Sequence, residues 1–302
     1  MICGGIDLGG SKIEARLFEG AEARTVDAKR VPTPGESYDA LLAALGQQVA
    51  WLEAQAGRAD LPVGIAVPGF LDPETGRLFA ANLVASGHPL ARDLNAQVGR
   101  EVVAVNDCMG FTLSEAVGGA GDAYHSVMGL ILGTGVGGGL ALGRQLAPRH
   151  GGVGVEIGHV GAPARSVARH GLPLFPCGCG RLGCIETYMS GTGLANIAEH
   201  KLGQRLSAEA LVAEGQDACL EIWADIAGEC LVTIQLTLAP DCIVLGGGLS
   251  NMPGIADRLR DAMAGHALTD MALPEIVVAK HGDSSGARGA ALLALQVEGL
   301  SC

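Results

Sequence analysis

Short apolar runs alternate along the chain with longer stretches in which apolar residues recur at helical spacing. The short runs predict buried strands, and the helical spacing predicts helices that present one apolar face to a core. The predicted strands cover residues 2–8, 13–18, 63–67, 101–105, 127–132, 140–142, 242–245 and 276–279. The predicted helices cover residues 36–56, 108–116, 219–238, 253–265 and 285–297. Strands that alternate with helices in this order indicate an α/β protein.

One arrangement of elements occurs twice. An apolar strand that ends at Asp7-Leu8 leads into Gly9-Gly10-Ser11-Lys12 and a second strand, and the strand at 127–132 leads into the glycine-rich stretch 133–139 and another strand. The second copy begins about 125 residues after the first. We therefore predict two similar halves that face each other, each with a glycine loop directed at a shared cleft.

Glycine loops let backbone N–H groups approach a ligand closely, and successive N–H groups can bind an anion. The first loop adds donors from Ser11 and Lys12, although an ordinary Gly-Gly hairpin turn explains it equally well. In the second loop glycine fills five of the seven positions from 133 to 139. This favours a phosphate cradle, because glycine destabilises regular structure by ~0.5–1 kcal/mol relative to alanine. A third loop, at 246–248, suits the wall of an adenine and ribose site.

Asn106 and Asp107 directly follow the apolar run 101–105 and precede the predicted helix at 108–116. A carboxylate in this position lies beyond the carboxyl end of a strand, where open α/β sheets bind their ligands. Either residue also suits the N-cap of the helix, and capping alone would explain Asp107. The glycine loops elsewhere in the chain favour a ligand-binding role for Asp107.

Three cysteines form the most distinctive cluster. Cys177, Cys179 and Cys184 lie within eight residues with glycines between them, so the chain can wrap around a small ion. Three thiolates and one imidazole form a closed tetrahedral zinc site of the structural kind. Inert buried cysteines are the alternative explanation.

The imidazole ligand would come from one of two histidines. His159, in the element Glu156-Ile157-Gly158-His159, is the upstream candidate, and His170 is the competitor. A metal here would fix the turn that presents Glu156 and the loop that presents Glu186.

Composition narrows the class of protein. The 302-residue chain carries a formal net charge of −12, which argues against a nucleic-acid partner. The N-terminus lacks the basic and apolar regions of a signal peptide, and no apolar run reaches the ~18 residues of a membrane span. We therefore expect a cytoplasmic protein without a membrane partner. Its nine cysteines are not expected to form a disulfide framework.

Together these motifs resemble the ROK family (repressor, open reading frame, kinase) of the hexokinase–actin-like superfamily. The motifs that carry the resemblance are Asp7-Leu8-Gly9-Gly10-Ser11-Lys12, Val67-Pro68-Gly69, Asn106-Asp107, the loop 133–139, Glu156-x-Gly158-His159, Cys177-x-Cys179-Gly180-x-x-Gly183-Cys184-x-Glu186 and Gly246-Gly247-Gly248. The family implies a two-lobed actin-like or hexokinase-like (ribonuclease H-like) ATPase fold with the ligand cleft between the lobes. We expect one lobe at residues 1–118, completed by a returning helix at 288–302, and the other at 119–287.

The resemblance also implies a reaction, the transfer of the γ-phosphoryl group of ATP to the 6-hydroxyl of a hexose. It points first to N-acetyl-D-glucosamine, with fructose, mannose and glucose as alternatives. Asp107 would be the general base. The implied sugar-binding residues are Gly69, Asn82, Asn106, Asp107, Glu156, His159 and Glu186. Asn82 has a second explanation, because a lone Asn in a loop usually makes turn hydrogen bonds.

The cofactors follow from the same resemblance. The residues that would contact ATP are Asp7, Gly9, Gly10, Ser11, Lys12, Gly133, Thr134, Gly135, Gly137, Gly138 and Gly247. Asp7 would hold Mg²⁺ through water. A structural Zn²⁺ would be bound by His159, Cys177, Cys179 and Cys184. The family alone implies a homodimer.

A sugar-sensing repressor is the alternative from another class, because regulators of this family carry an added N-terminal helix-turn-helix domain. Here the strand before the first glycine loop begins at residue 2, which leaves no room for that domain, and the net charge is wrong for DNA. A sugar-binding protein without activity would not need Asp107 and three glycine loops together. We therefore expect a kinase.

Overall fold

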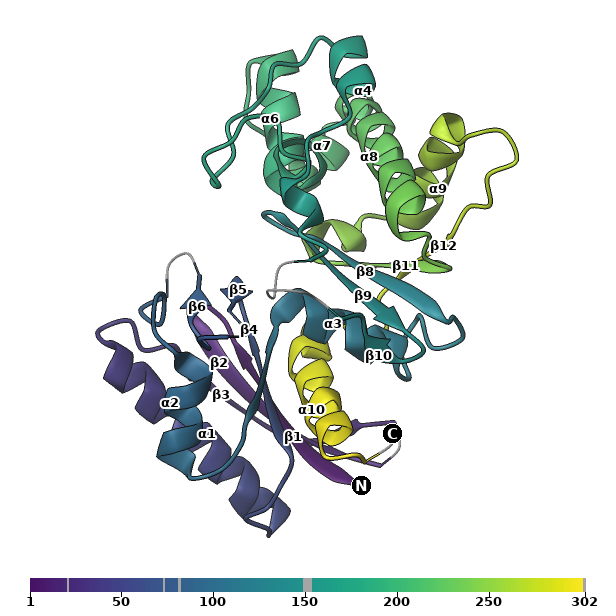
Figure 1. The fold of residues 1–302 in the computed structure, drawn as a ribbon. Helices are drawn as coiled ribbons and strands as arrows, with labels where there is room; N and C mark the ends of the chain where they lie inside the picture. Colours follow the sequence, from purple (N-terminus) through teal and green to yellow (C-terminus); the bar gives the residue numbers. More distant parts are fainter. Residues whose placement is uncertain (21, 73, 81–82, 149–153, 301–302) are drawn as a thin grey trace. The chain divides into compact units, whose positions relative to one another are not determined.

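The structure is a computed structural model that describes residues 1–20, 22–72, 74–80, 83–148 and 154–300. The chain divides into two compact units (Figure 1). The first comprises Met1–Asp122, Arg144–Gly154 and His281–Cys302, and the second comprises Ala123–Gly143 and Val155–Lys280. The predicted lobe boundaries stay a prediction. They differ from these units, for example, at residues 144–148, which belong to the first unit.

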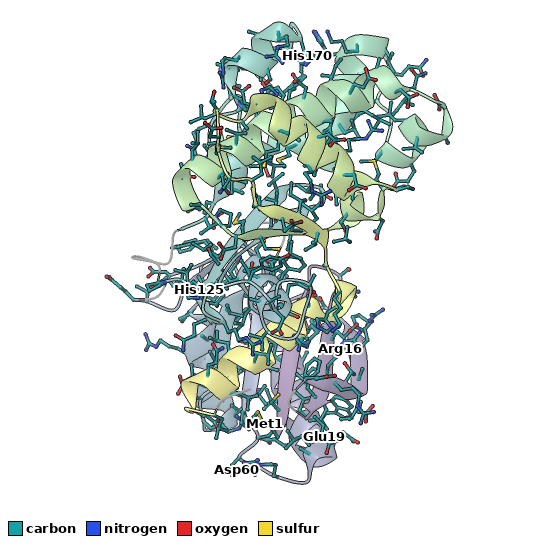
Figure 2. All side chains as sticks on the ribbon, turned by 90° about the vertical axis from the view of Figure 1, so that its right-hand side faces the viewer. Met1, Arg16, Glu19, Asp60, His125 and His170 are labelled. Atoms are coloured by element: carbon teal, nitrogen blue, oxygen red, sulfur yellow. The ribbon has the colours of Figure 1, made fainter. Side chains whose placement is uncertain are left out.

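The first unit is built on a five-stranded sheet. Its strands are β1 (Ile2–Leu8), β2 (Lys12–Glu19), β3 (Arg24–Pro32), β4 (Val63–Val67) and β7 (Val103–Asn106), in the order β3-β2-β1-β4-β7. β1 is antiparallel to β2 and parallel to β4, and β4 is parallel to β7. Met1 and Glu19, labelled in Figure 2, lie at the end of the β1–β2 hairpin opposite its glycine turn. A two-stranded ribbon, β5 (Phe70–Leu71) and β6 (Leu78–Phe79), follows β4.

Helices cover both faces of this sheet. They are α1 (Tyr38–Ala56), α2 (Leu90–Val98), α3 (Asp107–Ala116) and α10 (Ser285–Val297), which the 3-10 turn η4 (Gly282–Ser284) precedes. α1 shares one apolar core with β1 and β4, which includes Leu45, Ile6 and Ile65. α3 and α10 share another core, which includes Leu113 and Leu292. The first unit is therefore a three-layer α/β/α arrangement.

α10 lies very close to the sheet and to α3, because a glycine occupies one side of each contact. A β-carbon on Gly5 would lie 1.9 Å from the carbonyl oxygen of Ala287, and one on Gly64 would lie 2.0 Å from another α10 carbonyl oxygen. A β-carbon on Gly289 would lie 1.7 Å from the carbonyl oxygen of Gly110 in α3. Real β-carbons do not approach backbone atoms so closely, so glycine is required at these positions.

A buried arginine reinforces the contact between α10 and α3. Arg288 is 1% exposed. Its Nη1 donates to the carbonyl oxygens of Ser114 (2.6 Å) and Val117 (2.7 Å), which belong to the end of α3. Its Nη2 donates to the carbonyl oxygen of Glu22 (2.8 Å). These bonds to charged donors satisfy carbonyl groups that the end of a helix would leave without partners.

The second sheet has the same topology as the first. Its strands are β8 (Ser126–Leu132), β9 (Val136–Leu142), β10 (Gln145–Leu146), β11 (Cys242–Gly246) and β12 (Glu275–Val278), in the order β10-β9-β8-β11-β12. β8 is antiparallel to β9 and parallel to β11, and β11 is parallel to β12. In both sheets the first strand forms a hairpin on one side and a parallel pair on the other. This confirms that the two halves are similar.

The helices of the second unit pack around one long apolar helix, α8. They are α4 (Ala164–Arg169), α5 (Glu186–Met189), α6 (Gly191–Leu202), α7 (Ala208–Ala213), α8 (Asp217–Leu238) and α9 (Ile255–His266), with the 3-10 turns η2 (Ile157–His159) and η3 (Gly248–Asn251). Trp223 of α8 is fully buried, and its Nε1 donates to the carbonyl oxygen of Met189 (3.0 Å). Within the described ranges, no helix combines the length and apolarity that crossing a bilayer requires.

Several elements were not predicted. β3 was missed because it is a largely exposed strand without an apolar run. α6 was missed because two of its first three residues are glycines, which have a low helix propensity. One of them, Gly193, is required by packing, since a β-carbon there would lie 2.3 Å from the carbonyl carbon of Tyr188. α2 and α7 were missed as well. β6, which was not predicted either, ends before Asn82, and Asn82 lies outside the described residues.

The second glycine loop is shorter than predicted. β9 already begins at Val136, so residues 137–139 belong to a strand and the turn itself is confined to residues 133–135. A β-carbon on Gly138 would lie 2.7 Å from the side chain of Met128. Packing therefore contributes to the need for glycine at position 138.

Gly289→Ala tests the close packing of α10. We expect the free energy of unfolding to fall by ~3 kcal/mol or more, because the overpacking involves two backbones that cannot both move aside. The matched control is Gly265→Ala in α9, where no atom lies within 4 Å of the added β-carbon. This control should leave stability unchanged or raise it by up to ~1 kcal/mol. Urea denaturation measures both, and equal stability of the two variants would contradict the packing described here.

Candidate active site and metal centre

Three strands of the first sheet end side by side, and the polar residues expected to act in catalysis lie at these ends. In the sheet register Asp7 of β1 is opposite Ala66 of β4, and Val67 is opposite Asn106 of β7. Asp107 follows as the first residue of α3. The carboxyl ends of parallel strands are where open α/β sheets bind ligands. The structure therefore brings Asp7, Asn106 and Asp107 together at a suitable edge.

Asn106, and not Asp107, is the N-cap of α3. Its Oδ1 accepts hydrogen bonds from the backbone N–H groups of Cys108 (2.9 Å) and Met109 (3.2 Å). Its Nδ2 donates to the carbonyl oxygen of Gly69 (2.7 Å). The Asn106 side chain also lies close enough to the Asp107 carboxylate to act against the rise that burial causes in its pKa. Asn106 therefore takes the N-cap role, and Asp107 lies directly beside it as the first residue of the helix.

Burial raises the pKa of both carboxyl groups at this edge. Burial, and then the neighbouring Asp107 carboxylate, raise the pKa of Asp7 from 3.8 to about 6. Burial also raises the pKa of Asp107, although a hydrogen bond from the N–H of Cys108 (2.8 Å) works in the opposite direction. A carboxylate with a raised pKa is a stronger base, so Asp107 is suited to accept a proton.

The glycine turn between β1 and β2 leaves backbone groups open to a ligand. The N–H of Gly9 donates to the carbonyl oxygen of Lys12 (2.9 Å), which closes the turn. Thr33 holds the turn in place, because its Oγ1 donates to the carbonyl oxygen of Gly9 (2.7 Å) and its N–H to that of Ser11 (3.1 Å). No atom lies within 4 Å of a β-carbon placed on Gly10. This turn therefore has room for an anion, and Thr33 is a supporting residue that was not predicted.

The second and third glycine loops share one cavity of about 570 Å³ in the second unit. A β-carbon on Gly247 would lie 2.6 Å from the carbonyl oxygen of Leu132, so the third loop packs directly on the second. The N–H of Gly191 donates to the carbonyl oxygen of Gly133 (2.8 Å), which brings the start of α6 to the same cavity. The cavity is lined by Gly133, Thr134, Gly191, Thr192, Ala195, Arg205, Leu206, Ser207, Ala208, Glu209, Gly248 and Leu249. Its volume and its mixture of backbone, apolar and polar groups suit a small ligand.

Most of the lining of this cavity was not anticipated. Thr192, Arg205, Ser207 and Glu209 line it but were not predicted. Ser207 caps α7 through a hydrogen bond from the N–H of Ala210 (3.2 Å). A serine followed by an acidic residue in the first helical turn is a recognisable helix start, and that signal could have placed α7. It would not have shown that α7 faces the glycine turn.

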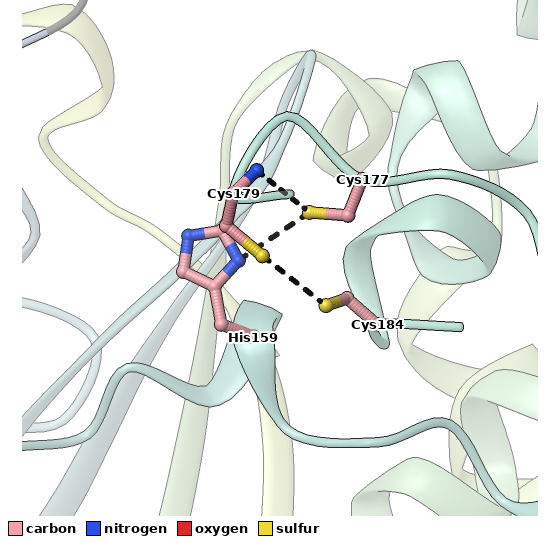
Figure 3. A group of neighbouring side chains, drawn as sticks. All are labelled: His159, Cys177, Cys179 and Cys184. Atoms are coloured by element: carbon pink, nitrogen blue, oxygen red, sulfur yellow. Dashed lines mark hydrogen bonds between the residues drawn. The ribbon is translucent and has the colours of Figure 1, made fainter. Parts of the chain in front are cut away.

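The three cysteines and His159 converge on one point (Figure 3). Their four ligand atoms all lie within 4.8 Å of one another. The Sγ atoms of Cys179 and Cys184 are 3.6 Å apart, and Sγ of Cys177 is 3.6 Å from Nδ1 of His159. A tetrahedral zinc site requires separations of about 3.8 Å between two sulfurs and about 3.6 Å between sulfur and nitrogen. The donor set and its spacing therefore fit a zinc ion.

His170 takes another partner. Its Nε2 lies 2.7 Å from Oδ2 of Asp225, and it does not belong to the metal-binding group. Of the two candidate histidines, His159 is therefore the one that can supply the imidazole ligand of the metal centre. Because Nδ1 of His159 faces the cysteines, its Nε2 is the nitrogen that remains for another ligand.

Glu186 connects the metal centre with the second glycine turn. Its Oε1 lies 2.8 Å from Sγ of Cys177 and 3.5 Å from Nδ1 of His159. A β-carbon on Gly135 would lie 2.8 Å from its Oε2. Glu156 is exposed and directly precedes η2, which carries His159. Asn82, the remaining residue expected to bind sugar, lies outside the described residues.

The repeated sheets, the glycine turns and the acidic residue at a strand end define the two-lobed actin-like class of kinase folds. A model of the ROK family matches residues 3–297, and the chain belongs to this family. N-acetyl-D-glucosamine kinase of Escherichia coli K12 is 42% identical over 300 residues, which cover 96% of this chain and 98% of that protein.

Solved structures agree with this assignment. A ROK hexokinase from Thermus thermophilus has a TM-score of 0.86 and 30% identity, and the match covers 99% of this chain and 100% of that one. A ROK family glucokinase from Streptomyces griseus, in complex with glucose and AMPPNP, has a TM-score of 0.77 and 26% identity, with 98% and 100% covered. These matches confirm the predicted fold class, and the full-length relatives confirm the predicted class of enzyme, a sugar kinase.

Asp7→Asn tests the electrostatics of the catalytic edge. Because the pKa of Asp7 is about 6 in the folded state against 3.8 when free, its contribution to stability is present below pH 3.8 and is lost as the pH rises through about 6. We expect the substitution to raise the free energy of unfolding by up to ~3 kcal/mol at about pH 7.5, with a smaller gain toward about pH 4. Urea denaturation in magnesium-free buffer measures it.

The matched control for this measurement is Asp261→Asn, an exposed carboxylate on α9. It should show no comparable trend with pH. If the Asp7→Asn variant gains nothing at neutral pH over acid pH, the carboxylate is not held in the unfavourable environment described here.

Proposed function

We propose that this chain phosphorylates the 6-hydroxyl of N-acetyl-D-glucosamine with ATP. The observation that carries the substrate is the 42% identity, over nearly the whole of both chains, to the E. coli kinase named for that sugar. Glucose is the second candidate, because the Streptomyces griseus glucokinase was solved with glucose and matches this chain over 98% of its length.

Asp107 is the general base of the proposed reaction. It accepts the proton of the 6-hydroxyl as that oxygen attacks the γ-phosphorus of ATP, and the bond between this phosphorus and the leaving oxygen of ADP breaks. Transfers of this kind depend mainly on positioning and charge neutralisation. Asn106 supports the base from the adjacent position by anchoring α3 and Gly69. The raised pKa of Asp107 is consistent with this role.

The sugar hydroxyls are bound by Glu156, Glu186 and Nε2 of His159, with Asn106, Gly69 and Asn82 lining the site. Carboxylates suit a polyol, because each has two oxygens that accept hydrogen bonds from hydroxyl groups. The position of Glu186 beside Gly135 supports its assignment, since the second glycine turn belongs to the proposed phosphate site.

ATP uses the glycine turns and the cavity of the second unit. Adenosine occupies the cavity of about 570 Å³, against Gly248 and α6, and Gly247 packs the third loop on Leu132. The backbone N–H groups of Gly9–Lys12 and of Gly133–Gly135 bind the phosphates, and Gly137 and Gly138 support the second turn from β9. Asp7 would hold Mg²⁺ through water, and the ion would supply neutralisation of phosphate charge.

A metal in the cysteine cluster would be zinc, with a structural role. Four protein ligands would satisfy a tetrahedral zinc ion and leave no position for a substrate. His159, Cys177, Cys179 and Cys184 would hold the ion, which fixes the loops that present Glu186 and Glu156. We also propose that the protein works in the cytoplasm as a homodimer, in keeping with the free thiols of Cys177, Cys179 and Cys184 and with the family resemblance.

A coupled assay of ADP release with a panel of sugars tests the function. The panel comprises N-acetyl-D-glucosamine, N-acetyl-D-mannosamine, glucose, mannose and fructose. We expect kcat/KM for N-acetyl-D-glucosamine to exceed that for every other sugar by ~10-fold or more. A higher value for glucose would overturn the proposed substrate. Sugar binding without ADP release would overturn the kinase itself.

Asp107→Asn tests the general base. The substitution keeps the size of the side chain and removes its basicity, so kcat should fall by ~10²–10⁴-fold while the Kd for the sugar changes little. Steady-state kinetics and calorimetric titration measure the two quantities. The control is Asp39→Asn, an exposed residue of α1 that should leave both unchanged. Turnover within a few-fold of the wild type would exclude Asp107 as the base.

A further inference from the structure

α4 connects the two segments that carry the metal ligands. His159 precedes this helix and Cys177 follows it in the chain. The two segments also pair with each other through their backbones. The N–H of Ala162 donates to the carbonyl oxygen of Gly183 (2.7 Å), and the N–H of Ile185 donates to that of Val160 (2.8 Å). The segment that carries His159 leads into α4, and the segment that carries Cys177 leaves it. The position of α4 therefore influences both segments.

α4 is too short to be stable without support. It has six residues, and its N-cap, Pro163, offers no side-chain oxygen to the first N–H groups. Isolated helices shorter than ~12–15 residues are marginal in water. The helix must therefore obtain its capping and its position from elsewhere in the fold.

Glu229 of α8 caps the first turn of α4 from outside. It is 4% exposed, and its Oε2 accepts the backbone N–H of Ser166 (3.1 Å), one of the N–H groups that a helix start leaves unpaired. The hydroxyl of Ser166 donates to the same oxygen, and Nε of Arg165 donates to Oε1 (2.6 Å). A carboxylate is also the favoured charge at a helix N-terminus.

Asp225, one helical turn earlier on α8, holds the other end of α4. Its carboxylate accepts hydrogen bonds from Nη1 of Arg169 (3.0 Å) and from Nε2 of His170 (2.7 Å), the histidine labelled in Figure 2. Nε2 of His266, at the end of α9, lies 2.9 Å from the same carboxylate. Residues four apart lie on one face of a helix. Asp225 and Glu229 therefore bind the two ends of α4 from the same face of α8.

Carboxylates on a largely apolar helix lose favourable contacts with water, and their partners must offset that loss. Buried ion pairs can often be replaced by apolar residues without loss of stability, and their best-attested role is to fix which of several packings forms. Here the arrangement that they fix is the register of α4 on α8. Outer residues that orient metal ligands affect metal affinity by ~10–100-fold.

We propose that Asp225 and Glu229 are positioning residues of the metal centre, which act through α4 on the placement of His159 and Cys177. Metal retention and sugar affinity depend on them, whereas ATP affinity does not. The expected effect on sugar affinity rests on the proposed function. The expected effect on metal retention does not depend on catalysis.

The test uses the Asp225→Asn and Glu229→Gln variants of the full chain in its metal-loaded form. Elemental analysis should find about one zinc per chain in the wild type. Both variants should release zinc to a coloured chelator ~10-fold faster or more. The KM for N-acetyl-D-glucosamine should rise by ~10-fold, with the KM for ATP within ~2-fold of the wild type. The matched control is Glu221→Gln, an exposed residue of α8 that removes the same charge and should match the wild type in all three measurements.

Three outcomes would overturn the proposal: zinc release at the wild-type rate in both variants, a wild type without metal, or a KM for ATP that rises as much as that for the sugar. The last outcome would show general loosening of the unit. If Glu229→Gln does not fold, the partly exposed Asp225 decides the question alone. A wild type without kinase activity overturns the proposed function, and the zinc-release comparison still tests the role of α8.

Discussion

The close packing of α10 against the first sheet and α3 is the constraint on which the positions of Asp7 and Asp107 at the ends of the strands depend. Glycines at 5, 64 and 289 let the backbones approach as no other residue would allow. In the first turn of α10, a β-carbon on Gly286 would lie 3.2 Å from Oδ1 of Asp7, so the same helix abuts one carboxylate directly. α3, packed against α10, begins with Asp107. One tightly packed contact therefore sets the positions of both acidic groups.

The two units use buried acidic residues in opposite ways. At the catalytic edge burial raises the pKa of Asp7 and of Asp107, and Asp107 itself adds to the shift of Asp7. In the second unit burial also acts to raise the pKa of Asp225 and Glu229, but their partners together outweigh it and lower both. These partners are His170, His266 and Arg169 for Asp225, and Ser166 and Arg165 for Glu229. The first pair retains charge in an unfavourable environment, whereas the second pair is satisfied by its partners. The direction of the shift thus reflects whether hydrogen bonds and opposite charges offset burial.

The sequence predicted most of the strands and half of the α-helices that the structure describes, including the strands that carry Asp7 and Asn106, because local signals mark them. α1 begins two residues after the predicted start and ends at the predicted residue, and the run 127–132 is β8 to within one residue. The sequence could not show that Asn106 takes the capping role, since two adjacent residues are equally good caps. The cavity beside α6 and α7 was missed because its lining comes from separated segments that only packing brings together. Thr33 was missed for the same reason.

The position of α10 in the chain has a consequence for biosynthesis. Gly5 and Ala287, which touch through their backbones, stand at opposite ends of the sequence, and the whole second unit is encoded between them. A ribosome therefore releases every strand of the first sheet long before the helix that covers one of its faces. The inserted unit has all of its segments available first, so it can fold while the nascent N-terminal region still exposes an apolar surface. Truncation late in translation would leave a folded inner unit attached to an incomplete outer one.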